Sequence, residues 1–198
     1  ATEGNALQAF ESDGFQMGND TNSNGSAYNY VAWNWKANGS GSSNTNGSIN
    51  STVSANTDAG FSIVSYTGNA TSGATVGHGL SSTPELIILK NRDSVTDWDV
   101  FHTSTGATKF LRLNTTAAES TNSAIWNDTA PTSSVFSLGN NADPNSNNEA
   151  YIAYCFHSVD GYSKVGSYTG NGNADGTFVY TGFRPKFVLF KATSRTSS

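Results

Sequence analysis

The stretch Tyr151-Ile-Ala-Tyr-Cys-Phe-His157 determines the predicted fold, because it alternates as a β-strand does and is apolar on both faces. Side chains on a strand point to opposite faces with a period of two residues. Tyr151, Ala153 and Cys155 therefore share one face, and the apolar residues between them share the other. A strand that is apolar on both faces is typical of a buried position inside a sheet. We predict a central strand over residues 150–157.

Other segments rich in β-branched and aromatic residues lie between clusters of Gly, Asn, Ser and Thr, as strands lie between turns. Residues that favour helices are scarce, so the sequence predicts an all-β protein. The expected architecture is an antiparallel β-sandwich of jelly-roll-like topology, arranged in tandem repeats. Strands are predicted over residues 28–36, 61–66, 85–90, 97–102, 109–113, 135–138, 162–168, 177–180 and 186–191.

The tandem repeats are inferred from segments that occur twice in the chain. Phe15-Gln-Met-Gly-Asn19 resembles Phe136-Ser-Leu-Gly-Asn140, and residues 30–36 resemble 151–157, both at a separation of 121 residues. A second group recurs about 101 residues later. In it residues 60–69 resemble 161–171, and 84–90 resemble 185–191.

The order of these segments predicts four parts. Residues 1–36 are interpreted as the second half of a β-sandwich repeat, 37–59 as an Asn/Ser/Gly-rich linker, 60–160 as a complete repeat, and 161–198 as the first half of a further repeat. Such a chain is expected to be a fragment of a longer protein. In the alternative interpretation, the two terminal halves form one discontinuous domain.

Composition and charge exclude several classes of protein. The net charge is −5 and the sequence pI is about 5.0, with no basic patch, which argues against nucleic-acid binding. No apolar run is long enough to insert into a membrane. The single cysteine, Cys155, excludes an intrachain disulfide and is expected to be a buried, inert thiol. His78, His102 and His157 show no metal-ligand spacing and are interpreted as structural or surface residues.

Two tryptophans, Trp98 and Trp126, are candidate glycan-binding residues, because an aromatic face can stack on the C–H face of a sugar ring. Aromatic residues in such a sequence can equally belong to the core. The paired residues Trp33 and Trp35 are interpreted in that way, since their counterparts Tyr154 and Phe156 are also aromatic.

The stretch Asp143-Pro-Asn-Ser-Asn-Asn-Glu149 places oxygen-bearing side chains at alternate residues, as calcium-binding loops do. Asp143, Asn145, Asn147 and Glu149 are therefore candidate calcium ligands, although the glycine and distal glutamate of an EF-hand are missing. The alternative is a solvated turn between strands. No other cofactor is expected. No catalytic residues are predicted either, because the sequence lacks paired catalytic carboxylates, a nucleophile motif and a phosphate-binding loop.

Several long motifs resemble a family of uncharacterised repeat domains found in large structural proteins of tailed bacteriophages, particularly marine and cyanobacterial phages. The motifs include Val76-Gly-His-Gly-Leu80, Asn127-Asp-Thr-Ala-Pro-Thr-Ser-Ser-Val-Phe136 and Tyr151-Ile-Ala-Tyr-Cys-Phe-His-Ser-Val-Asp-Gly-Tyr162. Proteins of this kind often also carry laminin-G-like or concanavalin-type jelly rolls.

The absence of catalytic motifs predicts that the chain is not an enzyme. The resemblance implies an extracellular virion protein, such as a tail fibre, spike or head-decoration component. Its expected partners are other virion proteins, further copies of the chain (by analogy with phage fibres, in a homotrimer) and host-surface glycan. Two alternatives stay open: a secreted, lectin-like carbohydrate-binding module, and a purely architectural decoration without a ligand.

Overall fold

The computed structural model describes residues 5–194, and the chain divides into two compact units, residues 1–35 and 36–198. The first unit contains an antiparallel hairpin of β1 (Leu7–Phe10) and β2 (Phe15–Met17), followed by the single-turn helix α1 (Thr21–Asn24). A hydrogen bond from the Glu11 amide to the Gly14 carbonyl closes the hairpin turn at 2.9 Å.

The second unit is built on an eight-stranded antiparallel sheet in the order β10-β9-β8-β7-β12-β5-β4-β3. The predicted central strand is β12, which pairs with β5 on one side and β7 on the other. The strands of this sheet are β3 (Ser42–Asn44), β4 (Ser51–Asn56), β5 (Phe61–Thr67), β7 (Leu86–Asn91), β8 (Asp99–His102), β9 (Lys109–Arg112), β10 (Ser120–Thr121) and β12 (Ala150–Phe156).

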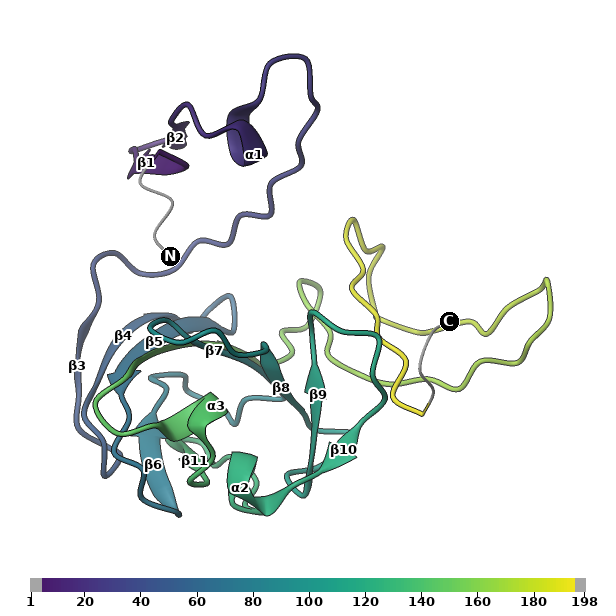
Figure 1. Cartoon of the computed structure of the whole chain (residues 1–198). Coiled ribbons are helices and arrows are strands. Elements are labelled where there is room, and N and C mark those ends of the chain that lie inside the picture. Colours follow the sequence, from purple (N-terminus) through teal and green to yellow (C-terminus); the bar gives the residue numbers. More distant parts are fainter. Residues whose placement is uncertain (1–4, 195–198) are drawn as a thin grey trace. The chain divides into compact units, whose positions relative to one another are not determined.

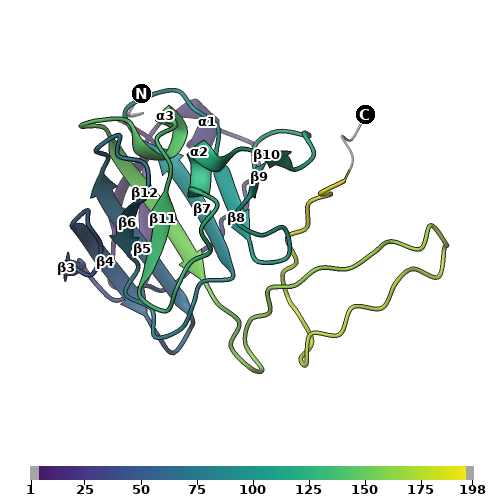
Figure 2. The ribbon, with the colours of Figure 1, turned by 90° about the horizontal axis from the view of Figure 1, so that it is seen from below.

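A second layer covers one face of this sheet (Figures 1 and 2). It consists of an antiparallel pair, β6 (Ala74–Gly77) with β11 (Val135–Leu138), and two single-turn helices, α2 (Ser123–Trp126) and α3 (Ala142–Asn145). The hydrophobic core lies between the layers. Its most deeply buried side chains include those of Val64, Val76, Ile87, Leu89, Ile125, Trp126, Phe136, Leu138, Tyr151 and Ala153.

The alternation within β12 explains why this strand lies at the centre. Tyr151, Ala153 and Cys155 are fully buried against the second layer, whereas the residues between them are half-buried on the other face. The predictions of an all-β protein and of an antiparallel sheet are confirmed. No helix within residues 5–194 has the length and apolar character needed to cross a membrane.

The predicted linker over residues 37–59 is wrong, because this segment supplies β3 and β4 to the large sheet. Ser51 and Val53 are buried, and all six residues of β4 pair with β5. The alternation in Ser51-Thr-Val-Ser-Ala-Asn56 is weak, since its inward side chains are small. The neighbouring strand β5, not local propensity, makes this segment a strand.

The predicted strands over residues 28–36, 162–168, 177–180 and 186–191 are not formed. In the described part of the chain, no residue from 18 to 41 pairs in a sheet, and pairing ends at Phe156 apart from one bridge between Val159 and Ser163. A strand needs a neighbour to satisfy its backbone groups, so a strand-like sequence without a partner stays irregular. The outermost parts of the predicted half-repeats, residues 1–4 and 195–198, lie outside the described residues.

Candidate functional site

Trp126, at the end of α2, is a core residue. Only 2% of it is exposed, and its ring meets Phe101 edge to face with 6.0 Å between ring centroids. The helix that carries it begins at Asn122, whose side chain accepts a hydrogen bond from the Ala124 amide at 3.0 Å. Because the ring is buried, it cannot stack on a glycan, and this part of the predicted binding site is wrong.

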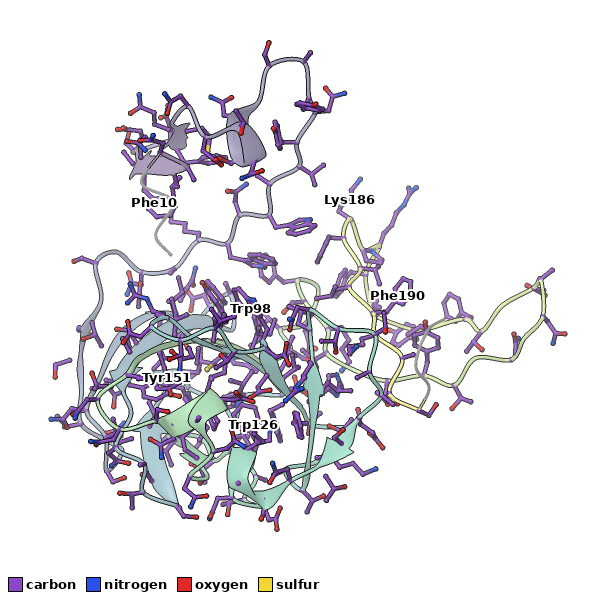
Figure 3. All side chains as sticks on the ribbon, viewed as in Figure 1. Phe10, Trp98, Trp126, Tyr151, Lys186 and Phe190 are labelled. Atoms are coloured by element: carbon purple, nitrogen blue, oxygen red, sulfur yellow. The ribbon has the colours of Figure 1, made fainter. Side chains whose placement is uncertain are left out.

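Trp98 is half-buried just before β8 and lies on the opposite face of the large sheet from Trp126 (Figure 3). Its amide donates to Asn114 Oδ1 at 2.9 Å, and Asn114 Nδ2 donates to Asp97 Oδ1 at 2.8 Å. Asp97 in turn pairs with Arg112 at 2.8 Å. The side chains of Asp97, Asn114 and Arg112 thus bond to one another beside the backbone of Trp98, and the role of Trp98 in glycan binding stays a prediction.

Asp99 lies next to Trp98 in sequence but faces the interior. Its side chain is 1% exposed, and its nearest cation, the Nε of Arg112, is 4.0 Å from Oδ1, which is too long for a hydrogen bond. The pKa of Asp99 is raised to about 7, mainly because the carboxyl is buried and to a smaller extent because the charge of Asp143 repels it. The charge of Arg112 lowers the pKa, but by less than burial raises it. Arg112 also contacts Asp143 at 3.5 Å. The carboxyl of Asp99 is thus a buried acid without a close partner.

The four candidate calcium ligands do not share a site. Asn145 is buried and bonds only to backbone groups, Asp143 pairs with Arg112, and Asn147 is exposed. Glu149 accepts hydrogen bonds from Asn91 at 2.5 Å and Ser94 at 2.6 Å, and its pKa is lowered by these bonds, with that from Ser94 the larger cause. Residues 5–194 contain no cluster of three or more His, Cys, Asp or Glu able to hold a metal. The prediction of a calcium loop is therefore replaced by a hydrogen-bonded turn.

This turn, together with the end of β5, forms what we call the turn anchor: Tyr66, Gly68, Asn69, Asn145 and Tyr151. The ring of Tyr66 stacks on that of Tyr151, with 5.1 Å between centroids and 13° between planes. The hydroxyl of Tyr66 donates to the Pro144 carbonyl at 2.7 Å. The hydroxyl of Tyr151 donates to the Ala142 carbonyl and accepts from the Ser146 amide, both at 2.7 Å. The two tyrosines thus hold α3 against the large sheet.

Asn145 completes the turn anchor from inside. Its Oδ1 accepts from the Asn69 amide at 2.9 Å, and its Nδ2 donates to the carbonyls of Thr71 at 3.0 Å and Gly139 at 2.9 Å. Gly68 must lack a side chain, because a Cβ there would lie 2.2 Å from the Ser146 carbonyl oxygen. A buried amide with every bond satisfied fixes the position of the backbone around it.

One half of this arrangement occurs again in the first unit, 121 residues earlier. Helix α1 stands at the position of α3, and Asn24 Nδ2 donates to the Gly18 carbonyl at 2.7 Å, as Asn145 does to Gly139. The hydroxyl of Tyr30 accepts from the Gly25 amide at 2.9 Å and donates to the Thr21 carbonyl at 3.2 Å. These bonds repeat those of Tyr151. The backbone agrees as well, since Ala27 and Asn148 both have positive φ, at 68° and 62°.

The other half occurs in the C-terminal segment. Asn171 Oδ1 accepts from the Asn173 amide at 3.0 Å, just as Asn69 Oδ1 accepts from the Thr71 amide at 2.9 Å. Gly172, with φ of 70°, stands where Ala70 has φ of 55°. In sequence, Tyr168 occupies the place of Tyr66. The segment therefore has the local conformation of the β5 end of the turn anchor.

The large apolar side chains of these two segments are exposed. In residues 28–35 they include Tyr28 and Val31, and in the C-terminal segment they include Phe178, Tyr180 and Phe190, all at least 73% exposed. The counterparts of Val31, Phe178 and Phe190 in the complete sandwich are Ile152, Val76 and Leu89, which lie in strands of its sheets. Large apolar side chains are more often buried than exposed, so their exposure in both segments is a notable feature of the described chain.

The histidine and cysteine side chains carry no reactive arrangement among residues 5–194. His78 is buried, and burial lowers the pKa of its imidazole. Its Nδ1 accepts a hydrogen bond from the Leu80 amide at 3.1 Å, and its Nε2 lies 3.2 Å from the Thr132 carbonyl oxygen. This pattern fits a neutral ring that joins two loops. Burial raises the pKa of Cys155 to about 12, so the thiol is inert at neutral pH, as the sequence predicts.

Sequence reasoning missed the turn anchor and the buried Asp99. A signal for the first was present, because Asn24 and Asn145, and likewise Tyr30 and Tyr151, are identical in the two copies. The burial of Asp99 had no comparable signal.

Comparison with curated proteins and with solved structures finds no match. Over residues 1–198 the sequence matches the family described as "Domain of unknown function (DUF7483)". The chain therefore belongs to the DUF7483 family.

Proposed function

We propose that this chain is a structural module of a virion appendage, such as a tail fibre, spike or head-decoration component, and that it acts through its shape and its contacts. It is built from repeated antiparallel β-sandwich units of jelly-roll-like topology. The assignment to a virion derives from the resemblance of its motifs to phage structural proteins.

One observation carries the proposal of a structural role. Two polar side chains that are identical in the two copies, Asn24 with Asn145 and Tyr30 with Tyr151, make bonds to the backbone of their own turns. The bonds that recur along the chain thus serve to fix the backbone of a turn. A module repeated for its shape suits an extended appendage.

Localisation on particles tests this proposal. Antibodies raised against the purified chain should decorate particles of a phage that encodes it, in electron micrographs, at a fixed position on the tail or head. Antibodies absorbed with the purified chain are the control. Labelling that stays with the host-cell fraction and is absent from purified particles would contradict the virion assignment.

Glycan binding is a second candidate function, favoured by the half-exposed ring of Trp98 beside Asp97, Asn114 and Arg112. Aromatic stacking combined with polar groups that bind hydroxyls is a typical arrangement for a sugar site. A glycan array with the purified chain should give a signal that Trp98→Ala abolishes and that Val95→Ala, a substitution at an exposed neighbour, leaves unchanged. An empty array, or a signal indifferent to Trp98, would reject this candidate.

A further inference from the structure

We propose that the N-terminal segment of one copy, residues 15–36, pairs with the C-terminal segment of a second copy, residues 161–191, and that the two together complete another sandwich unit. Copies would then join head to tail. The inference goes beyond the proposed function, because copies could join in this way whether or not the assembly belongs to a virion.

The first argument is the pairing in the complete unit. There β12 lies between β5 and β7, with Tyr151 opposite Tyr66 and Ala153 opposite Leu89. By sequence, residues 30–36 correspond to β12, residues 161–168 to β5 and residues 186–191 to β7. The N-terminal segment therefore contains the central strand, and the C-terminal segment contains the two strands that flank it.

The second argument is that each segment already has the local geometry of its half of the turn anchor. The bonds of Asn24 and Tyr30 reproduce those of Asn145 and Tyr151, and the Asn171 turn reproduces that of Asn69. In the complete unit the two halves meet where the Asn69 amide donates to Asn145 Oδ1. The corresponding bond would join the Asn171 amide to Asn24 Oδ1. Both halves are thus preorganised for the contact, which lowers the entropic cost of association.

The third argument is exposure. Tyr66 and Tyr151 are 5% and 0% exposed, whereas their counterparts Tyr168 and Tyr30 are 55% and 48% exposed. No residue between 18 and 41, and none after Ser163 in the described chain, is paired in a sheet. Neither segment forms a strand in the described chain, and a second copy carries the complement of each.

The geometry of such an assembly is heterologous, because the surface that each copy offers differs from the one it receives. Contacts of this kind generate rings when the rotation closes and open filaments when it does not. Addition of a strand to an edge supplies main-chain hydrogen bonds for affinity and side-chain pockets for register. The tyrosine stack would set that register.

Cross-linking of cysteine variants of the chain of residues 1–198 tests the pairing. Ile152 lies directly opposite Ser65 on the half-buried face of the sheet, and the corresponding positions are Val31 and Ser167. Val31→Cys protein mixed with Ser167→Cys protein should give disulfide-linked dimers under mild oxidation. Val31→Cys mixed with Val95→Cys, an exposed loop position, gives the background of random collisions. The native thiol of Cys155 is buried and stays inert.

Sedimentation of the unmodified full chain should show a mass that rises with concentration. Tyr168→Ala should weaken this association by at least about tenfold, as loss of a central aromatic side chain typically does. Val95→Ala should not change it, and the thermal unfolding of the complete unit should be the same in both variants. A chain that stays monomeric at all concentrations, or cross-linking no better than background, would overturn the proposal. So would a Val31→Cys/Ser167→Cys double variant that yields only cross-linked monomer.

Discussion

Tyr66 stacks on Tyr151 across the pair β5–β12, and both hydroxyls reach the same short helix, α3. The stack therefore links the centre of the large sheet to the second layer. Stacked aromatic rings stabilise a fold by more than their buried area alone accounts for. Removal of a hydroxyl that donates to a buried carbonyl leaves that carbonyl without a hydrogen bond.

Removal of one hydroxyl at a time measures that link. Tyr66→Phe should lower the free energy of unfolding by about 1–2 kcal/mol, because the Pro144 carbonyl loses its donor. Tyr151→Phe should cost more, since its hydroxyl bonds to the Ala142 carbonyl, the Ser146 amide and Asn91. Urea titration followed by fluorescence gives both values. Tyr154→Phe, at a half-buried position on the other face of β12, is the control and should change little.

Asn145 and Asn147 offer a matched pair in one turn. Asn145→Ala should destabilise the chain by about 2–4 kcal/mol, because it leaves one amide and two carbonyls without partners in a buried site. Asn147 is exposed, so Asn147→Ala should stay within about 0.5 kcal/mol of the parent. Both values come from the same urea titrations. Equal effects at the two positions would show that the turn is a solvated loop and not an anchor.

Calcium provides an independent check on the same turn. Since Asn145, Asp143 and Glu149 are committed to different partners, addition of millimolar calcium should leave the melting temperature unchanged, and removal by a chelator should do the same. Differential scanning calorimetry measures both. A rise of several degrees with calcium, lost in Asp143→Asn, would restore the calcium-loop interpretation of Asp143, Asn145, Asn147 and Glu149.

Sequence patterns predicted the strands of the complete unit where alternation involved large side chains. β12 and β5 were found in this way, whereas β4 was missed because its buried residues are small and polar or aliphatic, such as Ser51 and Val53. The failure at residues 28–36 and 162–191 has another cause. Propensity is local, but a strand exists only with a neighbour, and the neighbour is set by tertiary or quaternary contacts.

The site residues show the same division between local and non-local information. The oxygen-rich spacing of Asp143 to Glu149 indicates a turn correctly, but the direction of each side chain depends on β5, β7 and β9, which are distant in sequence. The sequence likewise does not show which of the two tryptophans, Trp98 or Trp126, is buried. One is buried because Asn122 begins a helical turn that packs it on Phe101, and nothing in the sequence around it specifies that contact.

The two tryptophans should therefore respond differently to substitution. Trp126→Ala should lower the free energy of unfolding by about 3–5 kcal/mol, because it leaves a large cavity beside Phe101. Trp126→Phe should cost only about 1–2 kcal/mol, since the indole Nε1 has no hydrogen-bond partner to lose. Trp98→Ala, at a half-buried position, should cost less than Trp126→Ala. Chemical denaturation ranks the three variants, and an equal cost for both alanine substitutions would contradict the burial described here.

The buried carboxyl of Asp99 should make stability depend on pH. Its folded pKa, about 7, lies above its ordinary value of 3.8. Between these values the folded chain holds a proton that the unfolded chain has lost, so stability falls as pH rises through this window, by up to about 1.4 kcal/mol for each pH unit. Below pH 4 and above pH 7 the contribution of Asp99 is constant. The lowered pKa values of His78 and His102 act in the opposite direction below their ordinary value of 6.5, so the total slope mixes both effects.

Comparison with Asp99→Asn isolates the carboxyl. This variant keeps the shape of the side chain but cannot ionise, so it should be more stable than the parent at pH 8, and the difference should shrink as the pH is lowered towards 5. Urea titrations at several pH values give the difference directly, while the histidine contributions cancel. A difference that is independent of pH would mean that Asp99 is ionised in the folded chain throughout. In that case Arg112, despite its 4.0 Å separation from Oδ1, would outweigh the cost of burial.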